Sequence, residues 1–487
     1  MGADVTLLLG VLVPLAGTLF IGLFGNRPNL RETVTLLTGV VLFGLVLSLW
    51  PVVLSGSRPE LVLAHPLPGI PLALQIEPLG LVFALVASSL WIVTSVYSIG
   101  YMRGHHEGHQ TRFYVFFAIA ISAAIGVAFS ANLFTLFLFY EVLTLCTFPL
   151  VTHHGTEKAK RAGRVYLGVL LTTSIGLQLL AIVWTYSLTG TLDFREGGIL
   201  SGQASSGVLT VLLALFVFGV GKAAVMPFHR WLPAAMVAPT PVSALLHAVA
   251  VVKAGVFTIL KVSVYVFGVD LITETGAADL LIWAAAATII LASLVAFTKD
   301  NLKARLAYST ISQLSYIVLG ALLANRWGII GGGMHIAMHA FGKITLFFGA
   351  GAIMVAAHKT EISQMRGLGR TMPITFGAFF LGALSIIGLP PAGGSWSKWY
   401  LGLGTLEAGQ IGLLAVLMLS SLLTLVYLLE IPVKGFFGSS QDRPHGGGIH
   451  EAPLPTLIAM GVTSVACILL FLFPDPLYRL MAMVMGG

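Results

Sequence analysis

The sequence predicts an all-α polytopic membrane protein, a bundle of helices that cross the bilayer many times. Of its 487 residues, 57% are hydrophobic and only 9% are charged, and the mean hydropathy is +0.95. Apolar runs of about 20 residues, the length of a helix that spans a bilayer, recur from end to end. This composition excludes a soluble globular protein, and we expect no soluble domain.

Apolar runs separated by charged or Pro/Gly-rich breaks predict fourteen membrane helices. The first run lacks the basic leader and small-residue cleavage site of a signal peptide, so we expect the protein to retain it. The predicted helices are residues 4–24, 32–54, 77–100, 112–130, 132–152, 163–187, 207–228, 240–267, 277–297, 304–324, 327–357, 371–404, 408–437 and 453–474.

The charged loops predict the orientation of these helices. An even number of helices places both termini on one side and divides the loops into two sets. Of the 26 basic residues, seventeen fall in one set, Arg443 among them, and four fall in the set with the termini: Arg58, Arg195, Arg326 and Arg479. Because cytoplasmic loops are enriched in Lys and Arg, we expect the first set in the cytoplasm and both termini outside.

The cysteines, the lack of cofactor motifs and the placement of the basic residues exclude several function classes. Cys146 and Cys467 lie in hydrophobic runs, without the spacing of an iron–sulfur or zinc site, and we expect both to be packing residues. No flavin, quinone, haem or iron–sulfur motif is evident, so we expect no cofactor. The net charge of +7 comes with basic residues in short loops, which the positive-inside rule explains better than nucleic-acid binding.

Five basic residues remain for the membrane interior, and all are lysines: Lys222, Lys253, Lys261, Lys343 and Lys398. No arginine is expected to be buried there. An ionisable residue at the bilayer centre costs about 2.5 to 3.5 kcal/mol on insertion scales, so these side chains need partners or water. Since buried lysine can lose its proton near physiological pH and arginine cannot, the choice of lysine favours groups that titrate.

Among the acids, only Glu141 lies deep within a predicted span, in the run LFTLFLFYEVLTLC. Its natural partner is a lysine from another span, with Lys222 as the first candidate. A purely structural ion pair is the alternative reading. Membrane helices pack well without such pairs, however, and an intramembrane carboxylate usually marks an ion or proton route.

Prolines predict two broken helices, each with one lysine beside the break. Pro227 follows Lys222 by five residues, and Pro390 and Pro391 precede Lys398. Proline removes a backbone donor and clashes with the preceding turn, and a broken helix at membrane depth is typical of transporter sites. A plain packing kink is the alternative. Because the breaks fall in the seventh and twelfth helices, the pattern indicates two repeats of five helices.

A row of titratable residues lies between the two breaks. His335, His339 and Lys343 follow at i, i+4 and i+8 and so share one helix face. Successive residues rise by about 6 Å, a distance that one water can bridge. Since histidine titrates near neutrality, the row predicts a proton wire. A metal site is the alternative, but no third or fourth ligand is evident.

The eighth predicted helix carries His247, Lys253 and Lys261 at different angles. Lys261 lies about 40° from the face of His247, and Lys253 lies well off that face. We expect His247 or Lys253 to face the interior. Lys261 is expected to extend its amine to the outer surface.

Four motifs together carry a resemblance to a known family: FYEVLTL with Glu141, GKAAVMPFHRWLPAAMVAPTPVSALLHAVAVVKAG with Lys222 and Lys253, DNLKARLAYSTISQ, and MHAFGKITLFF with Lys343. Over about residues 75 to 430 the chain resembles the antiporter-like subunits shared by Mrp-type multisubunit cation/proton antiporters, respiratory complex I and membrane-bound hydrogenases. It is most similar to the D-type subunit, because Thr172, Thr173 and Ser174 stand where some larger members carry an aspartate. The histidine of SALLHAVAVVKAGVF is closer to the larger type.

The resemblance implies a fourteen-helix fold with two inverted five-helix repeats, helices 4–8 and 9–13. The corresponding parts of the chain are 1–111, 112–268 (first repeat), 269–438 (second repeat) and 439–487. It also implies the role of each proton-transfer residue: Glu141 and Lys222 form the modulating pair, His247 and Lys253 the connection, His335, His339 and Lys343 the central relay, and Lys398 the exit.

The resemblance implies a proton-translocating subunit of a cation (Na⁺)/H⁺ antiporter, a transporter subunit and not an enzyme. We expect it in a bacterial or archaeal plasma membrane, with other membrane subunits as partners and protons, with or without Na⁺, as the transported ions. The alternative is a proton-pumping or coupling subunit of a complex I-like, hydrogenase-like or inorganic-carbon uptake complex, whose redox chemistry lies in partner chains.

Overall fold

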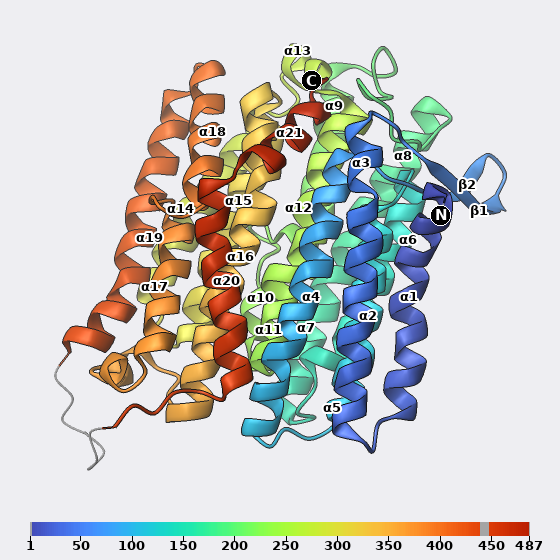
Figure 1. Cartoon of the computed structure of the whole chain (residues 1–487). Coiled ribbons are helices and arrows are strands. Elements are labelled where there is room, and N and C mark those ends of the chain that lie inside the picture. Colours follow the sequence, from blue (N-terminus) through green and yellow to red (C-terminus); the bar gives the residue numbers. More distant parts are fainter. Residues whose placement is uncertain (1, 439–447, 487) are drawn as a thin grey trace.

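The computed structural model of the chain describes residues 2–438 and 448–486, so that Arg443 and the predicted boundary at 439 lie outside the described residues. Helices lie side by side in an elongated bundle, with both chain ends toward the upper end in Figure 1. Within the described residues, twelve helices are long and apolar enough to cross a membrane, and two shorter ones, Ser206–Gly219 and Pro373–Ile387, fall in the two spans predicted to be broken. The helical membrane fold is confirmed, whereas fourteen crossings and two repeats stay predictions.

The helices begin and end close to the predicted bounds in most spans. Those of the first half are α1 (Ala3–Leu23), α2 (Pro28–Ser48), α3 (Trp50–Leu54), α4 (Pro78–Gly104), α5 (Gln110–Ala128), α6 (Leu133–Val151), α7 (Glu157–Thr173), α8 (Leu179–Thr189), α9 (Ser206–Gly219), α10 (Trp231–Ala234), α11 (Thr240–Ala244) and α12 (Val251–Val262). Those of the second half are α13 (Val269–Thr275), α14 (Asp279–Thr298), α15 (Leu302–Leu323), α16 (Arg326–Ala357), α17 (Pro373–Ile387), α18 (Gly394–Glu407), α19 (Ile411–Phe437), α20 (Leu454–Leu472) and α21 (Asp475–Val484).

A β-hairpin is the main element that the all-α prediction missed. Strands β1 (Glu60–Leu67) and β2 (Ile70–Gln75) pair antiparallel. Backbone hydrogen bonds from Gln75 N to Phe129 O, 2.6 Å, and from Ala131 N to Ala73 O, 3.1 Å, attach β2 to the turn between α5 and α6. The hairpin therefore positions the start of α4 on the end of the bundle where both termini lie (Figure 1).

Both predicted helix breaks are present. α9 ends at Gly219, and Lys222 lies in a short 3-10 turn, Gly221–Ala223, before the irregular segment that leads to α10. In the second break, α17 ends at Ile387 and α18 begins at Gly394, with Pro390 and Pro391 between them. Pro390 and Pro391 account for the second interruption, because proline cannot continue a helix ladder. The first interruption begins eight residues before Pro227, so that proline affects only the irregular segment after Lys222.

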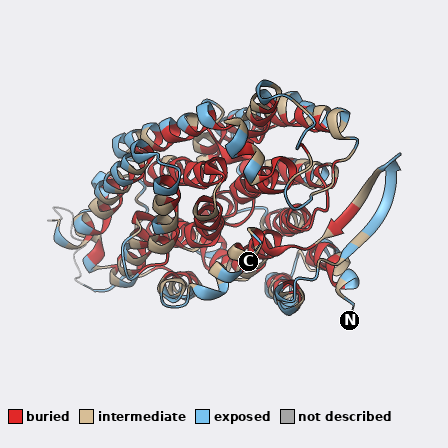
Figure 2. Ribbon diagram, turned by 90° about the horizontal axis from the view of Figure 1, so that it is seen from above, coloured by how far each residue is buried: buried red, intermediate tan, exposed pale blue. Residues whose placement is uncertain are grey.

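Burial separates a central group of helices from an outer rim. The most apolar window of Thr240–Phe267, which includes α11 and α12, is 100% buried, and that of α15 is 94% buried. The corresponding window of Pro28–Leu54, at the rim, is only 28% buried. Figure 2 shows the same division, with red in the interior and pale blue around the edge. The apolar rim is the surface that lipid or neighbouring subunits would cover.

The structure corrects two expectations about buried charges. Lys261 does not reach the surface: its side chain is 1% exposed and forms an ion pair with Glu77. Two arginines are also buried, Arg31 in α2 and Arg305 in α15, each in an ion pair with a glutamate. Both arginines lie in the first turns of their helices, so the prediction of loop positions was nearly right but the prediction of exposure was wrong.

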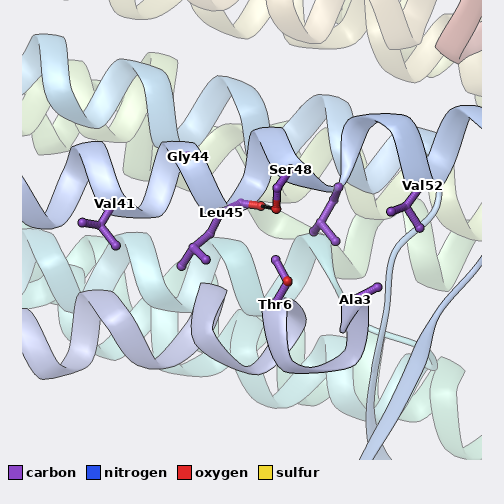
Figure 3. Close-up of a pocket in the computed structure, with 8 residues that line it drawn as sticks. Ala3, Thr6, Val41, Gly44, Leu45, Ser48 and Val52 are labelled. Carbon is purple, nitrogen blue, oxygen red and sulfur yellow. Dashed lines mark hydrogen bonds between the residues drawn. The ribbon is translucent and has the colours of Figure 1, made fainter. Parts of the chain in front are cut away.

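A groove of about 430 Å³ opens on the rim between α1 and α2. Its lining is mostly small and aliphatic, and Figure 3 shows Thr6 of α1 facing Leu45 and Ser48 of α2 across it. None of the predicted proton-transfer residues lines this groove. The candidate site therefore lies elsewhere, among the buried central helices.

Candidate functional site

Lys222 lies fully buried at the first break, where its amine is bound by α6. Its Nζ donates to the backbone oxygen of Tyr140, 2.9 Å away, and to Oγ1 of Thr144, 2.5 Å away. It also lies 3.1 Å from the centre of the Tyr140 ring, a cation–π distance. These three contacts satisfy an amine that burial would otherwise leave without water.

Close packing on both sides fixes the irregular turn that carries Lys222. Trp231 Nε1 donates to the oxygen of Gly221, 2.9 Å away, so the segment after the break folds back on it. On the other side, α12 approaches so closely at Gly255 that a Cβ there would lie 2.4 Å from the Lys222 backbone carbon. The break is therefore a packed structure, held from both sides.

Glu141 is next to Tyr140 on α6, but it does not bind Lys222 directly. Within the described residues, no ion pair of 4.0 Å or less joins the two, and Glu141 Oε1 is buried without a hydrogen-bond partner. The direct pair that we expected is not formed in this structure. Lys222 instead binds the neighbouring residue Tyr140, and the Glu141 charge acts on its amine only through space.

The connection from α12 to α16 is a direct contact. Lys253 Nζ lies 2.5 Å from Nδ1 of His339, and both side chains are buried. Two cations at this separation would repel by about 7 kcal/mol at an effective dielectric constant near 20. The geometry therefore fits one shared proton, carried by either residue.

His247 lies in a π turn, Leu245–Val249, just before α12. Its ring packs against Phe347, 4.5 Å between centroids, and within the described part of the chain neither ring nitrogen has a hydrogen-bond partner. The structure places His247 in the core, as predicted for one of the two residues, and Lys253 makes the actual contact with the histidine row.

The row on α16 continues to the second break. The rings of His339 and His335 are 5.7 Å apart, and His335 Nδ1 lies 2.8 Å from Oγ of Ser397 on α18. The Tyr316 ring is 5.9 Å from that of His335, and Lys398 Nζ lies 4.8 Å from the same tyrosine ring. Side chains thus follow one another from Lys253 to Lys398.

Lys398 is held as Lys222 is. Its Nζ donates to the backbone oxygen of Ile387, 3.0 Å away, and to Oγ of Ser421 on α19, 3.1 Å away. Unlike Lys222, it is only half-buried. The lysine at the second break is therefore the more accessible of the two.

Lys343 branches away from this row. Its Nζ donates to Oγ of Ser309 on α15, 2.7 Å away, and Tyr427 on α19 donates to the same oxygen, 3.0 Å away. Lys343 shares its helix face with His339, as the spacing predicted, but its hydrogen bond leads toward α15 and α19. The row has a side branch that sequence spacing did not predict.

Hydroxyl groups are the site residues that the sequence reading missed: Tyr140, Thr144, Ser309, Tyr316, Ser397, Ser421 and Tyr427. One signal was available for some of them, since Ser309, Ser312 and Tyr316 share a face of α15 at i, i+3 and i+7. The others are brought together only by tertiary packing. Within residues 2–438 and 448–486, no group of three or more His, Cys, Asp and Glu side chains is placed to hold a metal ion.

A polytopic bundle with a buried row of lysines and histidines between two broken helices defines an antiporter-like membrane subunit. Residues 130–424 match the family described as "NADH:quinone oxidoreductase/Mrp antiporter, TM". The chain belongs to this family, as the resemblance of its motifs predicted.

Individual relatives support the same family assignment. The chain is 33% identical over 422 residues to NADH-quinone oxidoreductase subunit N of Desulforudis audaxviator (strain MP104C), covering 82% of each chain. It is 32% identical over 432 residues to NAD(P)H-quinone oxidoreductase chain 5 of Picosynechococcus sp. (strain ATCC 27264 / PCC 7002 / PR-6), covering 80% of this chain and 63% of that relative, which is therefore longer.

Among solved structures, a chain of the Mrp complex from Dietzia sp. DQ12-45-1b matches with a TM-score of 0.87. The match covers 99% of this chain and 97% of that one, at 24% sequence identity. At this identity the likeness establishes the fold, and it extends over nearly the whole molecule.

Proposed function

We propose that this chain is the proton-translocating subunit of a multisubunit cation (Na⁺)/H⁺ antiporter, most like the D-type subunit. The observation that carries the proposal is the row Lys253, His339, His335 and Lys398, which links α12 to the second break through contacts of 2.5 to 5.9 Å. Lysine and histidine exchange protons, whereas a row poor in carboxylates repels sodium.

In the proposed mechanism, a proton reaches Lys222, passes to Lys253, is relayed by His339 and His335, and leaves through Lys398. The shared proton between Lys253 and His339 makes the central step short. His247 and Lys343, which border the relay, bias it by charge, since a cation on either lowers the proton affinity of its neighbours.

Glu141 acts as the switch in this mechanism. When its carboxylate approaches Lys222, opposite charge raises the proton affinity of that lysine, and when it withdraws, the proton moves on. The unpartnered Oε1 of Glu141 supports this role, because a buried oxygen without a donor is poised to gain one.

Three further features belong to the proposal. The two repeats are residues 112–268 and 269–438, one around each break. Both termini lie outside a bacterial or archaeal plasma membrane. The partners are other membrane subunits, as the relatives' names indicate for those proteins, and this subunit carries protons and holds no catalytic chemistry of its own.

The test is proton flux in proteoliposomes that contain the whole complex, purified through a tag on this chain. Replacing His339 by alanine removes the shared proton site, so we expect flux to fall more than tenfold while the complex still assembles. Lys158→Ala, a change at an exposed residue in the first turn of α7, serves as the matched control. Wild-type flux in His339→Ala would contradict the proposed path.

A second candidate is a proton-pumping or coupling subunit of a redox complex, because both relatives described above are subunits of quinone oxidoreductases. The chains that copurify with this one discriminate between the two. Iron–sulfur or flavin subunits in the purified complex favour the redox assembly, and small hydrophobic membrane subunits alone favour the antiporter.

A further inference from the structure

A buried ion pair between Lys261 and Glu77 lies beyond the relay, toward the end of the molecule that carries both termini. Lys261 of α12 lies 3.3 Å from Oε1 of Glu77, the residue just before α4, and the two side chains are 1% and 3% exposed. Lys261 Nζ also donates to the backbone oxygen of Ser130, 2.8 Å away, and faces the Phe194 ring, 4.5 Å from its centre. The amine is therefore fully coordinated in its charged form.

Glu77 is fixed more firmly than Lys261. Its oxygens accept from the backbone nitrogens of Leu79 and Gly80, 2.7 and 2.9 Å away, at the first turn of α4. Tyr265 donates its hydroxyl to Oε2, 3.2 Å away. Glu77 therefore has three donors besides the lysine, which fix it at the start of α4 as the stationary partner of the pair.

A surface cavity reaches the residues around this pair. It has a volume of about 340 Å³ and is lined by Val53, Gly56, Ser57, Arg58, Pro78, Glu196, Met483 and Gly486. Pro78 is the neighbour of Glu77 in sequence, and Arg58 lies over the Tyr265 ring, 5.9 Å from its centre. Arg58 also pairs with Glu196, whose side chain is 71% exposed. The cavity therefore reaches Pro78, the residue that follows Glu77, and Arg58, which contacts the Tyr265 ring.

The pair is also connected to the relay by its helix. Lys253 and Lys261 lie two turns apart on α12, about 12 Å along the axis, an interval that a short chain of waters can bridge. The same helix thus carries one lysine that contacts the histidine row and one that lies below the outer cavity.

We propose that Lys261 and Glu77 form a second proton outlet, in which Lys261 passes protons from Lys253 to the cavity beside Arg58 and Glu196. The proposal rests on the proposed function, since it needs protons at Lys253. Glu77 is the fixed counter-ion and Lys261 the carrier. The first half of the chain then has an outlet of its own, besides the one at Lys398.

A purely structural pair is the competing explanation, and replacement of Lys261 by arginine separates the two. Arginine keeps the positive charge and the ion pair with Glu77, but it does not release its proton. A structural role therefore predicts wild-type flux in Lys261→Arg, whereas a carrier role predicts a loss.

The experiment compares proton flux of the purified complex in proteoliposomes for Lys261→Arg, Lys398→Arg and the double variant, with Lys158→Arg as control. We expect each single variant to lose two- to fivefold and the double variant to lose more than twentyfold. Flux in Lys261→Arg equal to the control in both backgrounds overturns the proposal. Wild-type flux in His339→Ala would instead contradict the proposed function itself.

A second variant covers the case in which Lys261→Arg does not assemble. Ser57 is exposed at the cavity, so Ser57→Trp fills the outlet without touching the ion pair. Combined with Lys398→Arg, it is expected to reduce flux at least fivefold below Lys398→Arg alone. Unchanged flux in that combination overturns the outlet.

Discussion

The lysine at each helix break is surrounded by the same kinds of groups, which we call its cage. Lys222 and Lys398 each donate to one backbone oxygen and one hydroxyl and lie against one tyrosine ring, that of Tyr140 or Tyr316. The acceptor of Lys398, Ile387, is the last residue of the broken helix α17, whose final oxygens have no partner within the helix. The acceptor of Lys222, Tyr140, lies within the unbroken helix α6. The recurrence supports two related halves.

The cages differ in exposure and in nearby charge. Lys222 is fully buried beside a helix that carries Glu141, whereas Lys398 is half-buried, and no carboxylate within 4.0 Å pairs with it in the described part of the chain. Because a carboxylate and full burial make a group's proton affinity adjustable, the first site suits a switch. The second site, at Lys398, suits the release of protons.

The largest test of this difference is the loss of each lysine in turn. Lys222→Ala removes the lysine at the first break, so we expect proton flux in proteoliposomes to fall more than tenfold, above about 1.4 kcal/mol on the barrier. Lys398→Ala should lose only a few-fold, since the second outlet proposed at Lys261 still releases protons. Equal losses in the two variants would remove the distinction between switch and exit.

Glycines that pack against each break offer a structural test. A Cβ at Gly394 would lie 1.8 Å from the Ser385 oxygen, and one at Gly255 would lie 2.4 Å from the Ala223 nitrogen. Overpacking of this kind costs about 1 to 3 kcal/mol. We expect both alanine variants to lower the thermal unfolding temperature of the complex, Gly394→Ala more than Gly255→Ala. Gly377→Ala, where nothing lies within 4 Å, is the control.

Glu141→Gln tests the charge difference alone, because glutamine preserves the shape of the side chain. Without the carboxylate, Lys222 loses the group that modulates its proton affinity, and we expect flux to fall about three- to tenfold with normal assembly. The pH profile of transport should also change in this variant. If both flux and profile match the wild type, Glu141 is not the switch.

Long apolar runs predicted the helical membrane fold. The lysines could be singled out because burying a charge in lipid is costly wherever it occurs. Proline positions gave both breaks, and the helical period gave the common face of His335 and His339. The partner of Lys261 was missed, since Glu77 lies 184 positions away in the sequence and only tertiary packing brings the two together. The hydroxyl groups of the cages were also missed, because serine and tyrosine cost little to bury in a membrane span and so occur there without a function.

The smallest predicted effect concerns the tyrosines, whose hydroxyls make different contacts in the two cages. Tyr140 Oη accepts from the Lys222 backbone nitrogen, 3.1 Å away, and Tyr316 Oη donates to the Leu417 oxygen, 3.0 Å away. Phenylalanine keeps each ring against its lysine and removes the hydrogen bonds of the hydroxyl, one for Tyr140 and two for Tyr316, which also contacts Ser421 Oγ, 3.4 Å away. Each bond is worth about 0.5 to 1.5 kcal/mol. We expect Tyr140→Phe and Tyr316→Phe each to reduce flux about two- to threefold. Because the Tyr316 ring also lies beside His335, Tyr316→Leu should lose more flux than Tyr316→Phe. Equal flux in these two variants would show that the ring takes no part in the path to Lys398.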